Sequence, residues 1–343
     1  MNLPEYIHRR RAELMGCAML LIICFHSYAS LPFTLWYYVA YRNGNMGVDF
    51  FAFLAGFGCV FSLKKDRDIG AYYGRRMKRL LPPYYAALLL FCLVAGLPDL
   101  DAMLGMAVPI SVWIGYSGAY WYISACLLYY LLVPLFLYLI ENARCPRIMF
   151  LALMACFCLL IPYLTRETGP SKAIMRIPAL IAGTAMGAFY FSHDRRRDRW
   201  IDALLLALFY AAGVVLLRHK SLLVRRPFPI IASSQINRLR KVLRAPMIMA
   251  VAALVLEGME RTPLRLINAF LRATGRHTLG LYMGHVIVRY AAAHFLGLGG
   301  WKLLLVMLTV SWPVALLIEW GGKGLLFLAG KLMRPAPARA AGK

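Results

Sequence analysis

The chain contains few charged residues, and acidic residues are especially scarce. Only 16% of its 343 residues are charged, with 15 Asp and Glu against 39 Lys and Arg, whereas 61% are hydrophobic. Soluble domains contain about a quarter charged residues, so this composition argues against a soluble domain. The apolar residues are gathered in long runs, and a spanning helix needs about 20 of them. We therefore expect an all-α, polytopic transmembrane bundle.

Paired cysteines and metal-ligand spacings are also missing. Seven of the eight cysteines lie within apolar runs, no CxxC pair occurs, and no HxxxH or HExxH spacing is present. Cysteines of this kind are typical of small buried apolar residues, and they predict neither a disulfide framework nor a zinc site. A metal site built from His26, Asp49 and His285 has no support from spacing. We expect no metal cofactor.

Two further absences concern targeting and repeats. The first apolar run follows three arginines, but no small-residue cleavage site closes it, so we expect no cleavable signal peptide. No internal repeat is visible, which disfavours a transporter built from two similar halves.

The apolar runs predict about ten membrane spans and no separate soluble domain. A single transmembrane domain would cover residues 1–330, and residues 331–343 would form a polar cytoplasmic tail. The expected spans are 14–32, 46–63, 81–97, 120–140, 147–164, 174–191, 201–217, 246–259, 278–296 and 301–321.

The distribution of basic residues predicts the orientation. Segments 8–11, 64–79 and 192–200 are strongly basic, whereas 98–119 contains no Lys or Arg. Because cytoplasmic loops are enriched in Lys and Arg, both termini are expected in the cytoplasm. The same rule accounts for the net charge of +24, so nucleic-acid binding is not predicted. Segment 218–245 is also basic, although the count of ten spans places it on the outer side. The sequence does not decide on which side of the membrane this segment lies.

Two ionisable residues lie within or beside the first two apolar runs. His26 is about 18 Å into its span at 1.5 Å per residue, and Asp49 begins the second span beside apolar residues. Such groups are costly in a membrane and are functional candidates by default. If the two spans form an antiparallel hairpin, the carboxylate could meet the imidazole and make it a better base. The alternatives are a neutral, structural histidine and a carboxylate that only caps a helix.

Basic and aromatic residues supply further candidates. Arg76 and Arg79 are three residues apart and share a helix face, which suits recognition of phosphate or carboxylate, although anchoring by the positive-inside rule would also place them there. His285 lies in the middle of the ninth span. Arg176 is a further candidate, although its charge could simply snorkel to the membrane interface. Trp121 could belong to an aromatic belt or form a stacking platform for a sugar.

These segments occur in an order that resembles the membrane acyltransferase 3 family of bacterial O-acyltransferases. The resemblance covers about residues 11–290 and rests on ELMGCAMLLIICFH, GVDFFAFLAGF, YYGRRMKRLLPPYY, AYWYISACLLYYLLVP, RIPALIAG and GRHTLGLYMGH. It implies acyl transfer by His26 with Asp49, and donor binding by Arg76 and Arg79. It also implies, as candidate contacts of the substrate or transition state, Arg176, Trp121 and His285.

Two positions depart from the family pattern. The family usually has a basic residue eleven positions before its first-span histidine, where this chain has Met15, and a Ser where this chain has Ala55. Arg11 lies four residues before Met15 on nearly the same helix face, and its long side chain can cover much of one turn, about 5.4 Å. We therefore expect Arg11 to join the donor-binding residues. Arg10 is turned about 100° away from Arg11 around the helix, so it is a poorer candidate.

The resemblance implies transfer of an acyl group, expected to be acetyl, from acyl-CoA to a hydroxyl of a cell-surface carbohydrate or lipid-linked glycan. The expected location is the bacterial inner membrane, with the bilayer and the glycan acceptor as partners. Two other readings stay open on physical grounds. Intramembrane His and Asp would also suit a transporter or flippase for lipid-linked sugars or small anions, and a regulatory membrane subunit would not need His26. The acyl group, the acceptor and the oligomeric state do not follow from the sequence.

Overall fold

Every regular element that the structure describes is a helix. The structure is a computed structural model that describes residues 3–27, 44–96, 105–110, 113, 120–164, 170–191, 199–218 and 233–332. The predicted tail beyond 332, the 98–104 and 219–232 segments, and the end of the first predicted span lie outside them. The helices are α1 (Leu3–Arg9), α2 (Arg11–Ser27), α3 (Met46–Lys65), α4 (Ile69–Ala95), α6 (Trp121–Glu141), α7 (Pro146–Leu164), α8 (Ser171–Ile174), α9 (Ile177–Tyr190), α10 (Arg199–Arg218), α12 (Ser233–Met259), α13 (Arg265–Arg276), α14 (Thr278–His294) and α15 (Gly300–Leu332).

The helices agree with the prediction of an all-α membrane protein. In the described part of the chain, six helical segments are long and apolar enough to cross a bilayer, and each of the ten predicted spans overlaps a helix. The number of crossings stays a prediction. The six segments are Met46–Lys65, Ile69–Ala95, Trp121–Glu141, Ser171–Tyr190, Leu239–Met259 and Gly300–Leu332.

Helices α2, α3 and α9 form the tightly packed centre, because glycines let their backbones approach. A Cβ on Gly183 would lie 1.9 Å from the carbonyl oxygen of Phe53 on α3, and a Cβ on Gly47 would lie 2.4 Å from that of Ala18 on α2. Gly183 and Gly187 are four residues apart, the spacing of close-packed membrane helices. Gly47 meets α2 near Ile22, whereas Gly58 meets it at Arg11. Helices α2 and α3 are therefore antiparallel, as the hairpin hypothesis requires.

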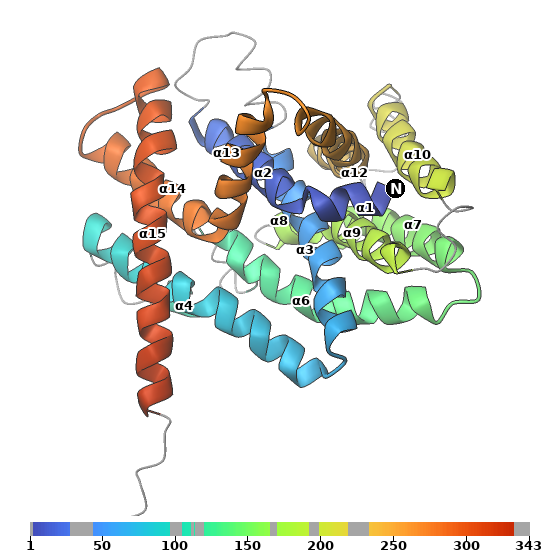
Figure 1. Cartoon of the computed structure of the whole chain (residues 1–343), viewed down its shortest axis with the longest axis horizontal. Coiled ribbons are helices and arrows are strands. Elements are labelled where there is room, and N and C mark those ends of the chain that lie inside the picture. Colours follow the sequence, from blue (N-terminus) through green and yellow to red (C-terminus); the bar gives the residue numbers. More distant parts are fainter. Residues whose placement is uncertain are drawn as a thin grey trace, which may run out of the picture.

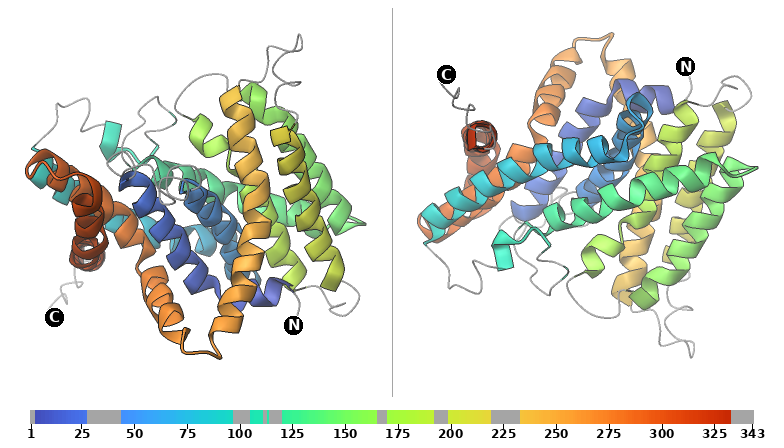
Figure 2. Two further views of the ribbon diagram at one scale, coloured as in Figure 1. Left: turned by 90° about the horizontal axis from the view of Figure 1, so that it is seen from above. Right: turned by 90° about the horizontal axis from the view of Figure 1, so that it is seen from below.

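The remaining helices surround this centre. The long helix α15 stands at one edge and packs against α4 and α14 (Figure 1). Helices α10 and α12 lie side by side at the other edge, seen clearly from above in Figure 2. Outward side chains include Leu93, Leu159, Trp320 and Phe327, which are each at least two-thirds exposed, as expected for surfaces that face lipid.

The basic segment 218–245 is partly helical rather than a simple loop. Its residues 233–245 are the first half of α12. Lys241 donates a hydrogen bond of 3.0 Å to the Oδ1 atom of Asn45, which directly precedes α3. This half of α12 therefore lies at the end of the bundle where α3 begins, opposite the turn between α3 and α4.

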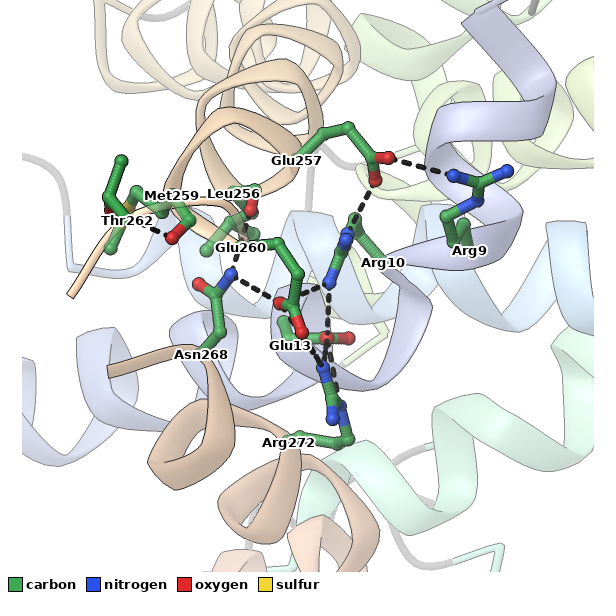
Figure 3. Close-up of polar contacts among 10 residues, drawn as sticks. All are labelled: Arg9, Arg10, Glu13, Leu256, Glu257, Met259, Glu260, Thr262, Asn268 and Arg272. Atoms are coloured by element: carbon green, nitrogen blue, oxygen red, sulfur yellow. Dashed lines mark hydrogen bonds and ion pairs between the residues drawn. The ribbon is translucent and has the colours of Figure 1, made fainter. Parts of the chain in front are cut away.

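A cluster of ion pairs ties the N-terminus to α12 and α13 (Figure 3). Arg10 contacts Glu257 and Glu260 at 2.7 Å and Glu13 at 3.3 Å, and its side chain is only 7% exposed. Arg272 of α13 contacts the same Glu13 at 2.8 Å. Hydrogen bonds from Asn268 and Arg10 lower the pKa of Glu260. The stabilisation from this carboxylate is thus present at neutral pH and is lost as pH falls through its lowered pKa.

We expect Arg10→Ala to destabilise the fold much more than Arg9→Ala. Removing one partner of a buried ion pair costs about 3–5 kcal/mol, whereas Arg9, whose side chain is 53% exposed, makes a surface pair with Glu257 worth up to about 1 kcal/mol. Thermal unfolding of the detergent-solubilised variants measures the difference. Equal shifts in Tm would show that the cluster does not hold the helices together.

Candidate functional site

The two intramembrane histidines that the sequence singled out are hydrogen-bonded to each other. Nε2 of His285 on α14 lies 2.9 Å from Nδ1 of His26 on α2, and the two ring centroids are 4.9 Å apart. His285 is fully buried. Residues 259 positions apart in the sequence therefore form one unit, which no local spacing predicts.

The surrounding backbone determines which nitrogen carries a proton. Nδ1 of His285 lies 3.1 Å from the carbonyl oxygen of Leu281, which can only accept, so Nδ1 must donate. In a neutral imidazole the other nitrogen is then an acceptor. Nε2 of His285 consequently accepts a hydrogen bond from Nδ1–H of His26. Nε2 of His26 is then unprotonated and carries a lone pair, the form that a general base requires.

Asp49 pairs with Arg176 rather than with His26. Oδ1 of Asp49 lies 3.3 Å from Nε of Arg176, and the two side chains are 3% and 12% exposed. The contact is an ion pair without hydrogen-bond geometry, because both atoms lack a hydrogen-bond partner in the described part of the chain. The guanidinium also lies over the ring of Trp121, 5.1 Å from its centroid. Of the two alternatives for Arg176, burial and pairing favour a site residue over a snorkelling one.

These residues share one cavity of about 410 Å³, which we call the histidine cavity. His26 and Asp49 both line it, so the hairpin brings them to the same space without pairing them directly. Helices α2, α3, α6, α8, α12 and α14 contribute to its wall, together with the two residues between α8 and α9. The described lining consists of Ile22, Phe25, His26, Asn45, Val48, Asp49, Trp121, Lys172, Met175, Arg176, Lys241, Val242 and Tyr282.

A second cavity, of about 90 Å³, gathers the predicted donor-binding arginines and is called the arginine cavity here. Arg11, Arg76 and Arg79 line it together with Met15, Tyr122 and Tyr282, and no acidic residue belongs to its described lining. Arg11 from α2 thus lies with the two arginines of α4, as expected if it takes the place of the basic residue that Met15 replaces. Three cations in one apolar wall are a suitable setting for a polyanion.

Gly58 allows two guanidinium groups to approach α3. A Cβ at this position would lie 2.1 Å from Nη2 of Arg11, and Arg76 donates a hydrogen bond of 3.4 Å to the Gly58 carbonyl. The guanidinium of Arg76 also lies 5.4 and 5.6 Å from the ring centroids of Tyr72 and Tyr130. Arg11 and Arg76 are therefore oriented by packing as well as by charge.

Tyr282 separates the two cavities, since it lines both. Its ring centroid is 5.7 Å from that of His285 and 5.6 Å from that of Tyr122. Along α3, Asp49 lines the histidine cavity, Cys59 lines the arginine cavity, and Lys64 lines a third cavity of about 460 Å³. The three cavities therefore follow one another along α3, from its first turn to the end where α3 meets α4.

Sequence reasoning found the ionisable residues but missed several neighbours. Tyr282, Lys241 and Lys172 gave no separate signal, because an aromatic residue in a span and basic residues near span ends are ordinary. Tyr282 stands three residues before His285 on the same face of α14, which is the one local clue. Among the described residues, no group of three His, Cys, Asp or Glu is arranged to hold a metal ion.

Comparison with known proteins gives one match. The acyltransferase 3 family model, described as an acyltransferase domain, matches residues 14–320. The match includes every residue of the two cavities that the sequence singled out except Arg11. No curated protein and no solved structure matches the chain.

Proposed function

Since this chain belongs to the acyltransferase 3 family and has several helices able to cross a bilayer, we propose that it is a membrane-embedded O-acyltransferase. In this proposal it moves an acyl group, which we take to be acetyl, from acyl-CoA on the cytoplasmic side to a hydroxyl of a cell-surface carbohydrate or lipid-linked glycan. The location would be the bacterial inner membrane, with both termini in the cytoplasm according to the charge distribution.

The hydrogen-bonded pair of His26 and His285 is the observation that carries the proposal. It gives His26 a defined tautomer beside a cavity large enough for part of an acceptor. A base held by a second group is the arrangement that general-base catalysis uses. A structural histidine would need only a partner, whereas this one also lines an open cavity and keeps Nε2 available.

The donor would enter from the arginine cavity. Arg11, Arg76 and Arg79 would bind its phosphates, and the thin pantetheine arm would pass Tyr282 towards His26. Because the two cavities share Tyr282, the thioester and the acceptor hydroxyl could meet there from opposite sides. The acyl-CoA is a substrate in this scheme, and no metal is required.

The chemistry follows from the position of His26. Its Nε2 takes the proton of the acceptor hydroxyl while that oxygen attacks the thioester carbonyl carbon. The carbon–sulfur bond then breaks, the new ester forms, and the imidazolium returns the proton to the thiolate. His285 accepts the Nδ1–H bond throughout and stabilises the transient positive charge. Arg176, which Asp49 and Trp121 orient, is our candidate to stabilise the oxyanion.

Thiol release tests this function directly. The purified protein in lipid nanodiscs is given acetyl-CoA and a glycan fraction from its own envelope, and free CoA is measured with a thiol reagent. An acyltransferase should release thiol only when acceptor is present. Mass spectrometry of envelope glycans from a deletion strain should show a missing acyl mass. A transporter or flippase would release no thiol and would leave the glycan masses unchanged.

We expect His285→Gln to retain far more activity than His285→Leu. The amide oxygen of Gln can accept the Nδ1–H bond of His26, whereas Leu removes this acceptor and so weakens the preference for the Nδ1–H tautomer. General-base catalysis contributes about 10²–10⁴-fold, so the Leu variant should lose roughly 10–100-fold in kcat through an incompletely oriented base. The Michaelis constant for acetyl-CoA should not change, since His285 does not line the arginine cavity. Equal activity of the two variants would refute the positioning role.

A further inference from the structure

A layer of aromatic side chains divides the histidine cavity from the arginine cavity. Tyr282 of α14 is the one residue that belongs to the described lining of both cavities. Tyr122 and Phe51 continue the layer on the arginine side, with the ring centroid of Tyr122 5.6 Å from that of Tyr282 and 6.0 Å from that of Phe51. Trp121, the neighbour of Tyr122 in the sequence, lines the histidine cavity instead. We call Phe51, Tyr122 and Tyr282 the aromatic partition.

The aromatic partition is closed in this structure. Its three residues are each at most 7% exposed. The ring of Tyr282 also packs against that of His285, 5.7 Å away between centroids, and Tyr129 lies 6.2 Å from Tyr122 by the same measure. Side chains packed as in a protein interior leave few gaps wider than a water molecule. The partition therefore has to move before the pantetheine arm of a donor can pass from one cavity to the other.

A closed partition matters because His26 as a base does not distinguish a sugar hydroxyl from water. The histidine cavity, about 410 Å³ and lined by polar side chains such as Asp49 and Asn45, is large and polar enough to hold water when no acceptor is bound. His26 would take a proton from that water while its oxygen attacks the thioester carbonyl carbon. The carbon–sulfur bond would then break and the proton would pass to the thiolate, which yields the free acid and CoA.

We propose that Tyr282 is a specificity-determining residue that selects the acceptor hydroxyl over water. This inference rests on the proposed function. While no acceptor is bound, the aromatic partition keeps the thioester on the arginine side, away from His26 and from the water beside it. An acceptor contacts Tyr282, because Tyr282 lines the cavity that the acceptor occupies. Its binding displaces the water and favours the ring position that lets the donor arm pass.

A series of shorter side chains at position 282 tests this role. Tyr282→Phe keeps the ring, Tyr282→Leu keeps part of its bulk, and Tyr282→Ala removes it. Each variant in nanodiscs is given acetyl-CoA without acceptor, and release of thiol and acetate is measured. Because a minor open state is typically about 0.1–10% populated, permanent opening in Tyr282→Ala should raise this hydrolysis about tenfold or more. The Leu variant should be intermediate and the Phe variant close to wild type.

Two further variants separate the partition from general loosening of the protein. Tyr84→Ala is the matched control, because Tyr84 is equally buried and lines neither cavity, and it should not raise hydrolysis. Adding His26→Ala to Tyr282→Ala should remove the extra hydrolysis, since the same base activates water. With the envelope glycan fraction present, the wild-type protein should form ester and thiol in equal amounts, whereas Tyr282→Ala should release more thiol than ester.

A chemical label tests the partition without catalysis. Ala55 lines the arginine cavity and is half-buried, so Ala55→Cys places a reporter thiol there. In intact cells, a membrane-impermeant methanethiosulfonate reaches the protein only from the outer face, the side of the histidine cavity in our proposal. Peptide mass spectrometry should find the reporter labelled when Tyr282→Ala is present, and unlabelled with Tyr282 or Tyr282→Phe. Lys172→Cys, at an exposed position that lines the histidine cavity, shows that the reagent enters.

The outcomes separate this inference from the function itself. Acceptor-dependent thiol release that no Tyr282 variant uncouples would leave an acyltransferase but overturn the role of Tyr282. Labelling of the reporter that depends on Tyr282, without thiol release by any variant, would support the partition and overturn the proposed function. Equal labelling with Tyr282 and with Tyr282→Ala would overturn the partition, as would equal hydrolysis by Tyr84→Ala and Tyr282→Ala.

Discussion

His26→Ala is expected to lose acyl transfer, by about 10²–10⁴-fold, the range that general-base catalysis supplies. Ala removes the only nitrogen in our mechanism that can take the hydroxyl proton, and it leaves Nε2 of His285 without the hydrogen bond from His26. Insertion and folding should persist, because the α2 packing against α3 and α13 depends on residues such as Gly16 and Ala18. The measurement is thiol release by protein that elutes as one peak in detergent.

His294→Ala is the control for this change. His294 ends α14, is exposed and stacks on Tyr290 with ring centroids 5.2 Å apart, so its loss removes an imidazole from the helix that carries His285 without touching the cavity. Near wild-type turnover by His26→Ala would sink the proposed mechanism. It would instead favour the regulatory or transport readings of the sequence.

Removing any arginine of the arginine cavity should raise the Michaelis constant for acetyl-CoA by about 10–100-fold, because a hydrogen bond to a charged group is worth about 1.5–3 kcal/mol. Arg76→Ala and Arg79→Ala test the two arginines of α4, and Lys78→Ala is the control. Lys78 lies between them in the sequence, is exposed and does not line the cavity. If all three variants bind the donor alike, the arginines only anchor the helix in the membrane.

Arg11 allows a sharper version of the same experiment. Arg11→Ala should weaken donor use to a similar extent, and adding Met15→Arg should restore much of it, since both positions line the arginine cavity. Gly58→Ala should act like a mild Arg11 variant, because its Cβ would displace the Arg11 guanidinium. Gly74→Ala is the matched control, with open space around its Cβ position. Full activity of Arg11→Ala would end the idea that Arg11 compensates for Met15.

The sequence by itself determined the class of fold and the identity of the ionisable residues. Charge is too expensive in a bilayer to be scattered, so long apolar runs predicted the helices, and the few ionisable groups within them, His26, Asp49 and His285, stood out. The order of the short segments was enough to indicate the acyltransferase 3 family, which the family model then confirmed. Those features are local, and each can be read within one or two turns of a helix.

Only the tertiary structure decided which residues are partners. The hairpin did bring His26 and Asp49 to one cavity, but His26 bonds to His285 and Asp49 pairs with Arg176. Within one helix, the sequence determines which face a residue occupies. How the helices are rotated and how they cross depends instead on contacts such as those of Gly47 and Gly183, which join distant segments. For the same reason, the sequence did not predict that Tyr282 and Lys241 line the cavity. Their positions follow from the packing of α14 and α12 against the central helices and not from the neighbouring residues in the sequence.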